Sequence, residues 1–405
     1  PEPGHRGAAG AGHCGWPDRA AGTYPRSYTG PLALALSVAL PWAAPVAAQP
    51  IQIVNLLELS GAGASVGTNL KNGAELAVKE INAAGGILGR KIELTTLDTQ
   101  TNPGVAKALA QKAVDMDAYA VIGPIFSGSI TVSMNETRRA EIPNFTGAAA
   151  AAVTQQGNPY IFRTNFTQAA SMPKVARYIK EQLKAQTVDV IYINNDFGKG
   201  GRDEFLKAAQ ALGLKIGADV STDQNQLDFS AAVLKAKQSS GDVLFAYTNE
   251  EESARLLREL RKQGYAKPVV GDTTIINQKT IELAGEAANG VVGHVALTAD
   301  APQPEVKAFV AKFERDFKYR PDHNGLQGYM TPYIIKAVTE KVGKVDRKAL
   351  AAALKGATLL VKDQPGLLLD VRFDDKGDPD RVSYLVEIRN GKQVVTNTLA
   401  PAKPF

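Results

Sequence analysis

Two serines, Ser127 and Ser129, have the types and the spacing to bind an anion. They follow an apolar run, Tyr119–Ile122, that is typical of a buried strand in a parallel sheet, and Gly123-Pro124 ends that run. A helix-compatible pattern comes next. A strand that passes through a tight loop into a helix points free N–H groups and the positive end of the helix dipole at one place. With the two hydroxyls added, we expect this place to bind a carboxylate.

The same serines have a purely structural alternative. Ser127 or Ser129 could cap the helix and bind nothing else. The local sequence favours neither interpretation, so the choice depends on the rest of the chain.

A second pattern, Gly63-Ala64-Ser65-Val66-Gly67, matches the G-x-S-x-G nucleophile elbow of hydrolases and lies between a predicted strand and a predicted helix. Such an enzyme needs a histidine later in the chain, and only His294 and His323 follow it. The motif also comes at the first strand, earlier than the usual nucleophile of that fold. A hydrolase that uses Ser65 is therefore a distant alternative, and we expect no catalytic residue.

Cofactor chemistry finds little support in the sequence. The loop with Gly61, Gly63 and Gly67 is close to a dinucleotide fingerprint, but only Asp98 could supply the acidic residue after the second strand. The two histidines are too far apart to suggest a metal site. We therefore expect neither a cofactor nor a metal ion.

The N-terminus has the features of an export signal. Basic residues precede an apolar run at Leu32–Leu40, which is too short to span a membrane. Val46-Ala47-Ala48 gives a small-residue cleavage pattern, so residues 1–48 are interpreted as a signal peptide with an upstream leader. Cys14 lies in that leader, so the mature chain should have no thiol and no disulfide. A periplasmic location is expected.

The composition is that of an ordinary globular protein, with 44% hydrophobic and 21% charged residues among 405. This length suffices for two or three domains. Lys and Arg are spread along the chain rather than clustered, and the formal net charge is only +5. Nucleic acid is therefore not an expected partner.

The mature chain alternates between strand and helix patterns, which predicts parallel sheets covered by helices on both faces. The first predicted strand is Ile51–Leu59, followed by a glycine-rich loop at 60–67 and a helix from Thr68. There are too many strands for one modest sheet, so we expect two similar α/β lobes. In the tail, residues 367–373 and 382–388 are predicted to be antiparallel strands joined by a polar turn.

Aromatic residues recur where the predicted strands end. They are Phe126, Phe145, Phe162, Phe197 and Tyr247. Each one alone is best explained as ordinary core. Together they could form the wall of an apolar pocket that has polar groups at one end.

Several stretches agree on one family. Residues 72–92, which read NGAELAVKEINAAGGILGRKI, strongly resemble the first helix and turn of the leucine/isoleucine/valine-type solute-binding proteins of ABC transporters. Residues 121–124, 196–200 and 373–378 are similar to later motifs of the same family. The resemblance covers about residues 51–395.

The resemblance implies a type I periplasmic binding fold, in which two doubly wound parallel-sheet lobes are joined by a three-stranded hinge and close on a ligand. The crossovers would lie near Thr164, Thr298 and Leu369. The implied segments are 49–164 and 299–369 for lobe 1, and 165–298 and 370–405 for lobe 2.

The resemblance also implies a site for the ligand carboxylate. The serine that grips the carboxylate falls on Ser127. A pair that offers backbone groups and a hydroxyl falls on Ala148 and Ala150, but an alanine at 150 has no hydroxyl. Thr146 or backbone N–H groups could take its place.

The remaining implied site residues lie mostly in the second lobe. Gln168 falls where amino-acid sensors of the family often have Asp, and Phe197 falls where Tyr is frequent. Asp272 would meet an α-ammonium group, with Glu250 as a neighbour. Phe126 and Tyr247 resemble pocket walls.

These features predict a protein that binds a small carboxylate and delivers it to the membrane permease of an ABC importer. An aliphatic amino acid is the first choice of ligand, and an amino-free aromatic or keto acid is the second. A regulatory sensor domain is disfavoured by the predicted signal peptide. A monomer is expected.

Cleavage is predicted between Ala48 and Gln49, because the apolar run is followed there by the small residues that signal peptidase requires. Mass spectrometry of the exported protein should find a chain that starts within a few residues of Gln49. A product that retains Leu32–Leu40 would contradict this prediction.

Overall fold

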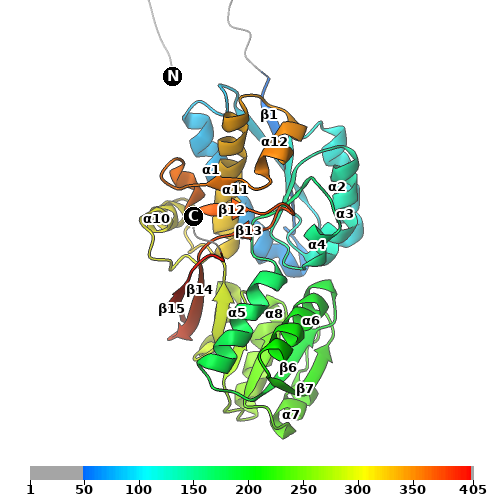
Figure 1. Cartoon of the computed structure of the whole chain (residues 1–405), viewed down its shortest axis with the longest axis vertical. Helices are drawn as coiled ribbons and strands as arrows, with labels where there is room; N and C mark the ends of the chain where they lie inside the picture. The colour runs from blue at the N-terminus through cyan, green and yellow to red at the C-terminus, as the bar shows by residue number, and fades with distance from the viewer. Residues whose placement is uncertain (1–48, 403–405) are drawn as a thin grey trace, which may run out of the picture. The chain divides into compact units, whose positions relative to one another are not determined.

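The computed structural model describes residues 49–402, whereas the predicted signal peptide and Cys14 lie outside the described residues. The described chain forms two α/β lobes, each built on a largely parallel sheet with helices on both faces (Figure 1). This confirms the predicted class of fold. None of the helices within 49–402 is long and apolar enough to cross a membrane.

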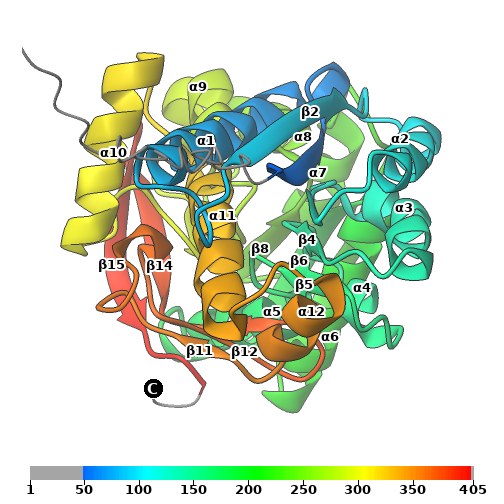
Figure 2. The ribbon, with the colours of Figure 1, turned by 90° about the horizontal axis from the view of Figure 1, so that it is seen from above.

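The first sheet has five parallel strands in the order β2-β1-β3-β4-β5. The strands are β1 (Ile51–Leu57), β2 (Ile92–Asp98), β3 (Ala120–Ile122), β4 (Asn144–Thr146) and β5 (Ile161–Arg163). Its helices are α1 (Ala64–Ala83), α2 (Pro103–Asp115), α3 (Ser127–Arg139), α4 (Ala152–Gln155), α10 (Pro304–Phe317), α11 (His323–Val342) and α12 (Arg347–Leu354). The helices α1 and α11 pack on one face, and α2 and α3 lie together on the other (Figure 2).

The second sheet has seven strands in the order β15-β14-β10-β9-β8-β6-β7. The parallel strands are β6 (Thr187–Ile193), β7 (Lys215–Thr222), β8 (Val243–Tyr247), β9 (Val269–Gly271) and β10 (Val292–Val295), and the antiparallel edge is β14 (Ser383–Arg389) with β15 (Lys392–Leu399). Its helices are α5 (Gln168–Glu181), α6 (Asp196–Ala211), α7 (Ser230–Gln238), α8 (Glu250–Lys262) and α9 (Gln278–Ala284). A core around Phe205 and Phe245, whose ring centroids are 3.9 Å apart, joins this sheet to α5 and α6.

The predicted glycine-rich loop at 60–67 is mostly helical. A short 3₁₀ turn (Gly61–Gly63) leads into α1, which begins at Ala64 rather than Thr68. The glycines are needed because this end of the helix lies directly on the backbone after β1. A Cβ on Gly67 would lie 2.1 Å from the carbonyl oxygen of Glu58.

The predicted hairpin in the tail is wrong. The strand β12 (Val371–Phe373) pairs with β13 (Pro379–Asp380) and with β11 (Thr358–Leu359), whereas β14 pairs with β10 and β15. The turn after β12 is tight, since the N–H of Asp374 donates to the carbonyl of Asp378 at 2.9 Å, and it therefore pairs the residues that flank it directly.

The chain thus joins the second sheet at Ser383, later than the crossover predicted near Leu369. The predicted crossovers at Thr164 and Thr298 fall between β5 and α5 and between β10 and α10. The lobe boundaries as a whole stay a prediction.

The helices α1 and α11 meet backbone to backbone. A Cβ on Gly73 of α1 would lie 2.1 Å from the carbonyl oxygen of Gly325, and one on Gly328 of α11 would lie 2.0 Å from that of Leu70. Only glycine allows this approach. The contact holds α11, whose first residues reach the cavity described below, against the first sheet.

Gly328→Ala should force the two helices apart and lower the free energy of unfolding by about 1–3 kcal/mol, the usual cost of overpacking. The control is Gly104→Ala at the exposed start of α2, where the nearest atom to the new Cβ is Oδ1 of the capping Asn102 at 3.2 Å, a side-chain atom rather than the backbone of another helix. Urea unfolding measures both. Equal effects would show that the contact between α1 and α11 tolerates a side chain.

Candidate functional site

A cavity of about 170 Å³ lies where the carboxyl ends of the strands of both sheets face each other. Five helices, α2, α3, α6, α8 and α11, begin beside it. The first lobe contributes Val66, Ile125, Phe126, Ser127, Gly147 and Ala149. The second lobe contributes Asn195, Phe197, Tyr247, Glu250, Asp272 and Thr273. This is where open α/β sheets bind ligands, because backbone N–H groups of helix starts converge there.

Ser127 lies at the cavity but does not cap α3. It is the first residue of the helix, and the N-cap position belongs to Phe126, whose side chain makes no capping hydrogen bond. The Ser127 hydroxyl accepts a hydrogen bond from the N–H of Ala150 at 3.3 Å. A hydroxyl that accepts in this way can still donate its own proton, and a carboxylate is a suitable acceptor. The second serine, Ser129, also lines the cavity.

A buried glutamate, Glu58, holds the loop that leads to Ser127. Its carboxylate accepts hydrogen bonds from the N–H groups of Ile125 at 3.2 Å and Phe126 at 3.1 Å. Burial raises the pKa of Glu58 to about 7, although these hydrogen bonds act in the opposite direction. The loop is therefore fixed from behind by Glu58, which does not line the cavity.

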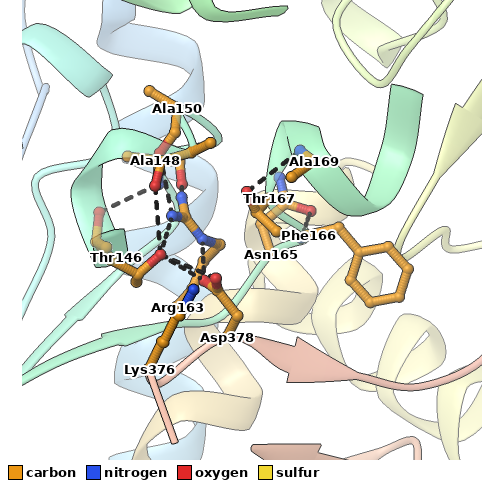
Figure 3. Close-up of polar contacts among 12 residues, drawn as sticks. Thr146, Ala148, Ala150, Arg163, Asn165, Phe166, Thr167, Ala169, Lys376 and Asp378 are labelled. Atoms are coloured by element: carbon orange, nitrogen blue, oxygen red, sulfur yellow. Dashed lines mark hydrogen bonds and ion pairs between the residues drawn. The ribbon is translucent and has the colours of Figure 1, made fainter. Parts of the chain in front are cut away.

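The neighbouring loop is fixed by Arg163, which is fully buried at the end of β5 (Figure 3). Its Nε donates to Asp378 Oδ1 at 2.8 Å, and its guanidinium also donates to the carbonyl oxygens of Ala148 and Ala150. These carbonyls therefore point toward Arg163. Gly147, which precedes them, and Ala149, which lies between them, line the cavity instead.

Three of the predicted carboxylate-site residues thus lie behind the cavity wall. Ala148 and Ala150 alternate with the lining residues Gly147 and Ala149 and do not line the cavity themselves. The hydroxyl of Thr146 donates to the carbonyl of Pro124 at 2.6 Å and accepts from the N–H of Ala148 at 3.1 Å, so it is engaged within the fold. Nothing in a run of five alanines marks which ones face a ligand.

The second lobe brings two acids to the cavity. Asp272 follows β9, and its Oδ1 lies 3.2 Å from His294 Nδ1 and 3.5 Å from Thr273 Oγ1. Glu250 is the first residue of α8 and is buried. Burial raises its pKa to about 8, and the nearby charges of Asp322, Glu252 and Glu251 act in the same direction.

An aromatic pair forms the wall on the second lobe. The rings of Phe197 and Tyr247 stack with centroids 4.3 Å apart. Gln168 lies behind this pair rather than at the cavity, since its Nε2 donates to the carbonyl of Phe197 at 2.7 Å and to the Tyr247 hydroxyl at 3.0 Å. Phe126 and Ile125 face the pair from the first lobe. The structure therefore gathers Ser127, Phe126, Phe197, Tyr247, Glu250 and Asp272, six of the predicted residues, around one cavity.

Sequence reasoning missed His323 and Asn324, which line the cavity from the start of α11. Residues 321–325 resemble a turn, yet Asp322 caps the helix by accepting from the N–H groups of Asn324 and Gly325. An Asp followed by an apolar-periodic segment was the available signal.

The carboxyl groups around the cavity have no cationic side chain beside them in its described lining. Asp196, Glu250 and Asp272 line it, and none of the described residues around it is Lys or Arg. No group of three His, Cys, Asp or Glu within 49–402 could hold a metal ion. Helix N-termini therefore lie on both sides of the cavity, with the hydroxyl of Ser127 in the first lobe and the carboxyl groups in the second.

The profile of the periplasmic binding protein family matches residues 50–393. The chain belongs to this family. The binding protein is 27% identical to Leu/Ile/Val-binding protein homolog 1 of Brucella abortus over 331 residues. This alignment covers 82% of this chain and 88% of that relative. It is 30% identical to an amino acid binding protein of Pseudomonas aeruginosa over 335 residues. This alignment covers 81% of this chain and 87% of that relative.

Solved structures share the fold. The branched-chain amino acid transporter substrate binding protein of Streptococcus pneumoniae, in complex with isoleucine, matches with a TM-score of 0.77 and 24% identity over 88% of this chain and all of that one (100%). An ABC transporter solute binding protein of R. palustris, in complex with benzoate, matches with a TM-score of 0.78 and 23% identity over 87% and 97%. These findings confirm the resemblance and the type I periplasmic binding fold.

A member of this solute-binding family is not an enzyme, so the alternative of a hydrolase that uses Ser65 is excluded. Ser65 lies in the first turn of α1 and does not line the cavity described above.

The raised pKa of Glu250 predicts a stability effect. A folded-state pKa of about 8, against 4.5 in the unfolded chain, favours folding below pH 4.5, and this contribution is lost as the pH rises through 8. Glu250→Gln should therefore gain stability relative to the unliganded wild type as the pH rises from 5 to 8, on the order of a few kcal/mol. Urea unfolding at both pH values measures this difference, and a difference that does not change with pH would contradict the prediction.

Proposed function

We propose that the binding protein captures an aliphatic α-amino acid between its lobes, with the carboxylate at Ser127 and the start of α3 and the ammonium group at Asp272 and Glu250. The observation that carries the proposal is the charge of the cavity, which has three carboxyl side chains and no Lys or Arg around it. An amino acid supplies the missing cation itself. An amino-free carboxylate would bring a further negative charge into a partly buried acidic site.

The size and the walls of the cavity support a small apolar side chain. A dry cavity of about 150 Å³ holds benzene, so about 170 Å³ suits a branched aliphatic chain or a single ring. Val66, Ile125, Phe126 and Phe197 supply the apolar surface. The names of the relatives point the same way, since one is a Leu/Ile/Val-binding protein homolog and one structure holds isoleucine.

An amino-free aromatic acid is the second candidate. It is favoured by the structural neighbour that holds benzoate and by the stacked pair Phe197–Tyr247, which could receive a ring. Asp272 opposes it, whereas Glu250, whose pKa burial raises to about 8, is mostly protonated at neutral pH and could donate a hydrogen bond to the ligand carboxylate.

Delivery to the membrane permease of an ABC importer completes the proposal. It rests on the family, on the ABC transporter named for the benzoate-bound neighbour, and on the predicted signal peptide, which would place the protein in the periplasm. No cofactor is part of it.

A thermal-shift screen of L-amino acids and of matched amino-free acids tests the class of ligand. A ligand at about 100 times its Kd should raise the free energy of unfolding by roughly 2.7 kcal/mol. Leucine, isoleucine or valine should give the largest shifts. A shift with benzoate or a keto acid, and none with any amino acid, would decide for the second candidate.

Two variants test separately how the carboxylate and the ammonium group of the ligand are bound. Ser127→Ala removes a donor to a charged group and should weaken any carboxylate ligand by about 1–3 kcal/mol, whereas Ser65→Ala, outside the cavity, is the matched control. Asp272→Asn should weaken an amino acid by about 2–5 kcal/mol but leave an amino-free acid bound equally well or better. Calorimetry measures both. Carboxylate binding that is unchanged in Ser127→Ala would refute the role of α3.

A further inference from the structure

The acid at the proposed ammonium end has an unusual neighbour in His294 of β10. This histidine is almost completely buried, at 1% exposure, and its Nδ1 lies 3.2 Å from Asp272 Oδ1. Its other ring nitrogen, Nε2, is also buried and has no hydrogen-bond partner among the described residues. The site described above assigns no role to His294.

The two nitrogens fix the protonation of the ring. An ionised carboxylate can only accept hydrogen bonds, so the proton must be on Nδ1, which faces Asp272. The opposite tautomer would turn a lone pair toward the carboxylate and would bury an unpaired N–H at Nε2. Burial also lowers the pKa of His294, which keeps the ring neutral.

The ring is held in place independently of Asp272. It stacks on Phe166 of the first crossover, with centroids 5.9 Å apart and planes inclined by 23°. Lys174 Nζ lies 4.5 Å from the centroid of the Phe166 ring and donates to Ser383 Oγ at 2.7 Å. The donor that faces Asp272 therefore sits on a ring whose position is set by the hinge region and by β14.

We propose that His294 is a positioning residue for ligand recognition, which holds Oδ1 of Asp272 through a neutral Nδ1–H group so that Oδ2 faces the ammonium group of the ligand. This inference rests on the proposed function, in which Asp272 receives that group. Thr273 Oγ1 approaches the same Oδ1, and none of the described residues makes a hydrogen bond to Oδ2. One oxygen is thus held by the protein, and the other is left for the cavity that Asp272 lines.

Two substitutions distinguish the effect of the Nδ1–H donor of His294 from the effect of its ring. His294→Asn keeps an N–H donor near the place of Nδ1, whereas His294→Phe keeps a ring on Phe166 but has no donor. By calorimetry, His294→Phe should weaken L-leucine by roughly 10-fold or more, the usual effect of losing a hydrogen bond to a charged group. It should leave 4-methylpentanoate, the same skeleton without the amino group, within about 2-fold of its wild-type affinity. His294→Asn should restore most of the affinity for L-leucine.

The pH profile supplies a readout that a merely structural role would not move. Without the donor, the pH below which L-leucine binding is lost should rise in His294→Phe and return in His294→Asn. The other titratable or charged groups that face Asp272, His294 or the same end of the cavity are Lys174 of α5, Tyr247 of β8, Glu250 of α8 and His323 of α11. All four are the same in every variant, so the shift between variants reports the loss of the donor. Equal weakening of both probes, or an unchanged profile, would overturn the inference.

A measurement on the unliganded full chain keeps the test independent of the ligand and of the folding of the variants. Nitrogen-15 NMR of the imidazoles, with His294 assigned by its absence from His294→Asn, should show a protonated Nδ1 and an unprotonated Nε2. The opposite tautomer would refute the role of His294 even if leucine binds. If no amino acid binds the wild type, the proposed function fails, while the tautomer still decides what His294 does to Asp272.

Discussion

The buried ion pair between Arg163 and Asp378 is the interaction on which the site depends most. Arg163 has no exposed surface, and Asp378 is the one acid in the described chain that forms an ion pair with it. Removing one partner of such a pair costs about 3–5 kcal/mol, because the other charge is left buried and uncompensated. The pair joins β5 to a turn that lies 215 residues later in the chain.

The same guanidinium sets the backbone of the cavity. Because it binds the carbonyls of Ala148 and Ala150, it decides which groups of that loop face the cavity. Glu58 likewise holds the loop at Ile125 and Phe126, by accepting hydrogen bonds from their N–H groups. One wall of the cavity is therefore made of backbone held by two buried side chains, Arg163 and Glu58, and the residues that line it there need no long side chains.

The alternation of strand and helix and the motif at 72–92 could be predicted from the sequence, because each depends on local spacing. The residues at the ends of strands and the starts of helices could also be located from the sequence, and Ser127, Phe197 and Asp272 do line the cavity. All of them lie where the topology of a parallel sheet must place them.

What failed depends on contacts between distant parts of the chain. The register of Ala148–Ala150 is set by Arg163, and the pairing of β12 is set by its tight turn and by β11. Gln168 was expected at the ligand but supports Phe197 and Tyr247, since the side chain at the start of α5 points along the wall rather than into the cavity. No local pattern carries this information.

The aromatic stack in the second lobe has an evolutionary consequence. Phe205, Phe245, Tyr247 and Phe197 form one continuous series of stacked rings that runs from the core of the lobe to the cavity. A change in any of these rings would disturb the core as well as the ligand, so this wall is costly to vary. The opposite wall, with Val66, Ile125 and Phe126, stands on a helix start and a loop. Descendants of this protein that acquire a new ligand should therefore differ first on the wall of the first lobe.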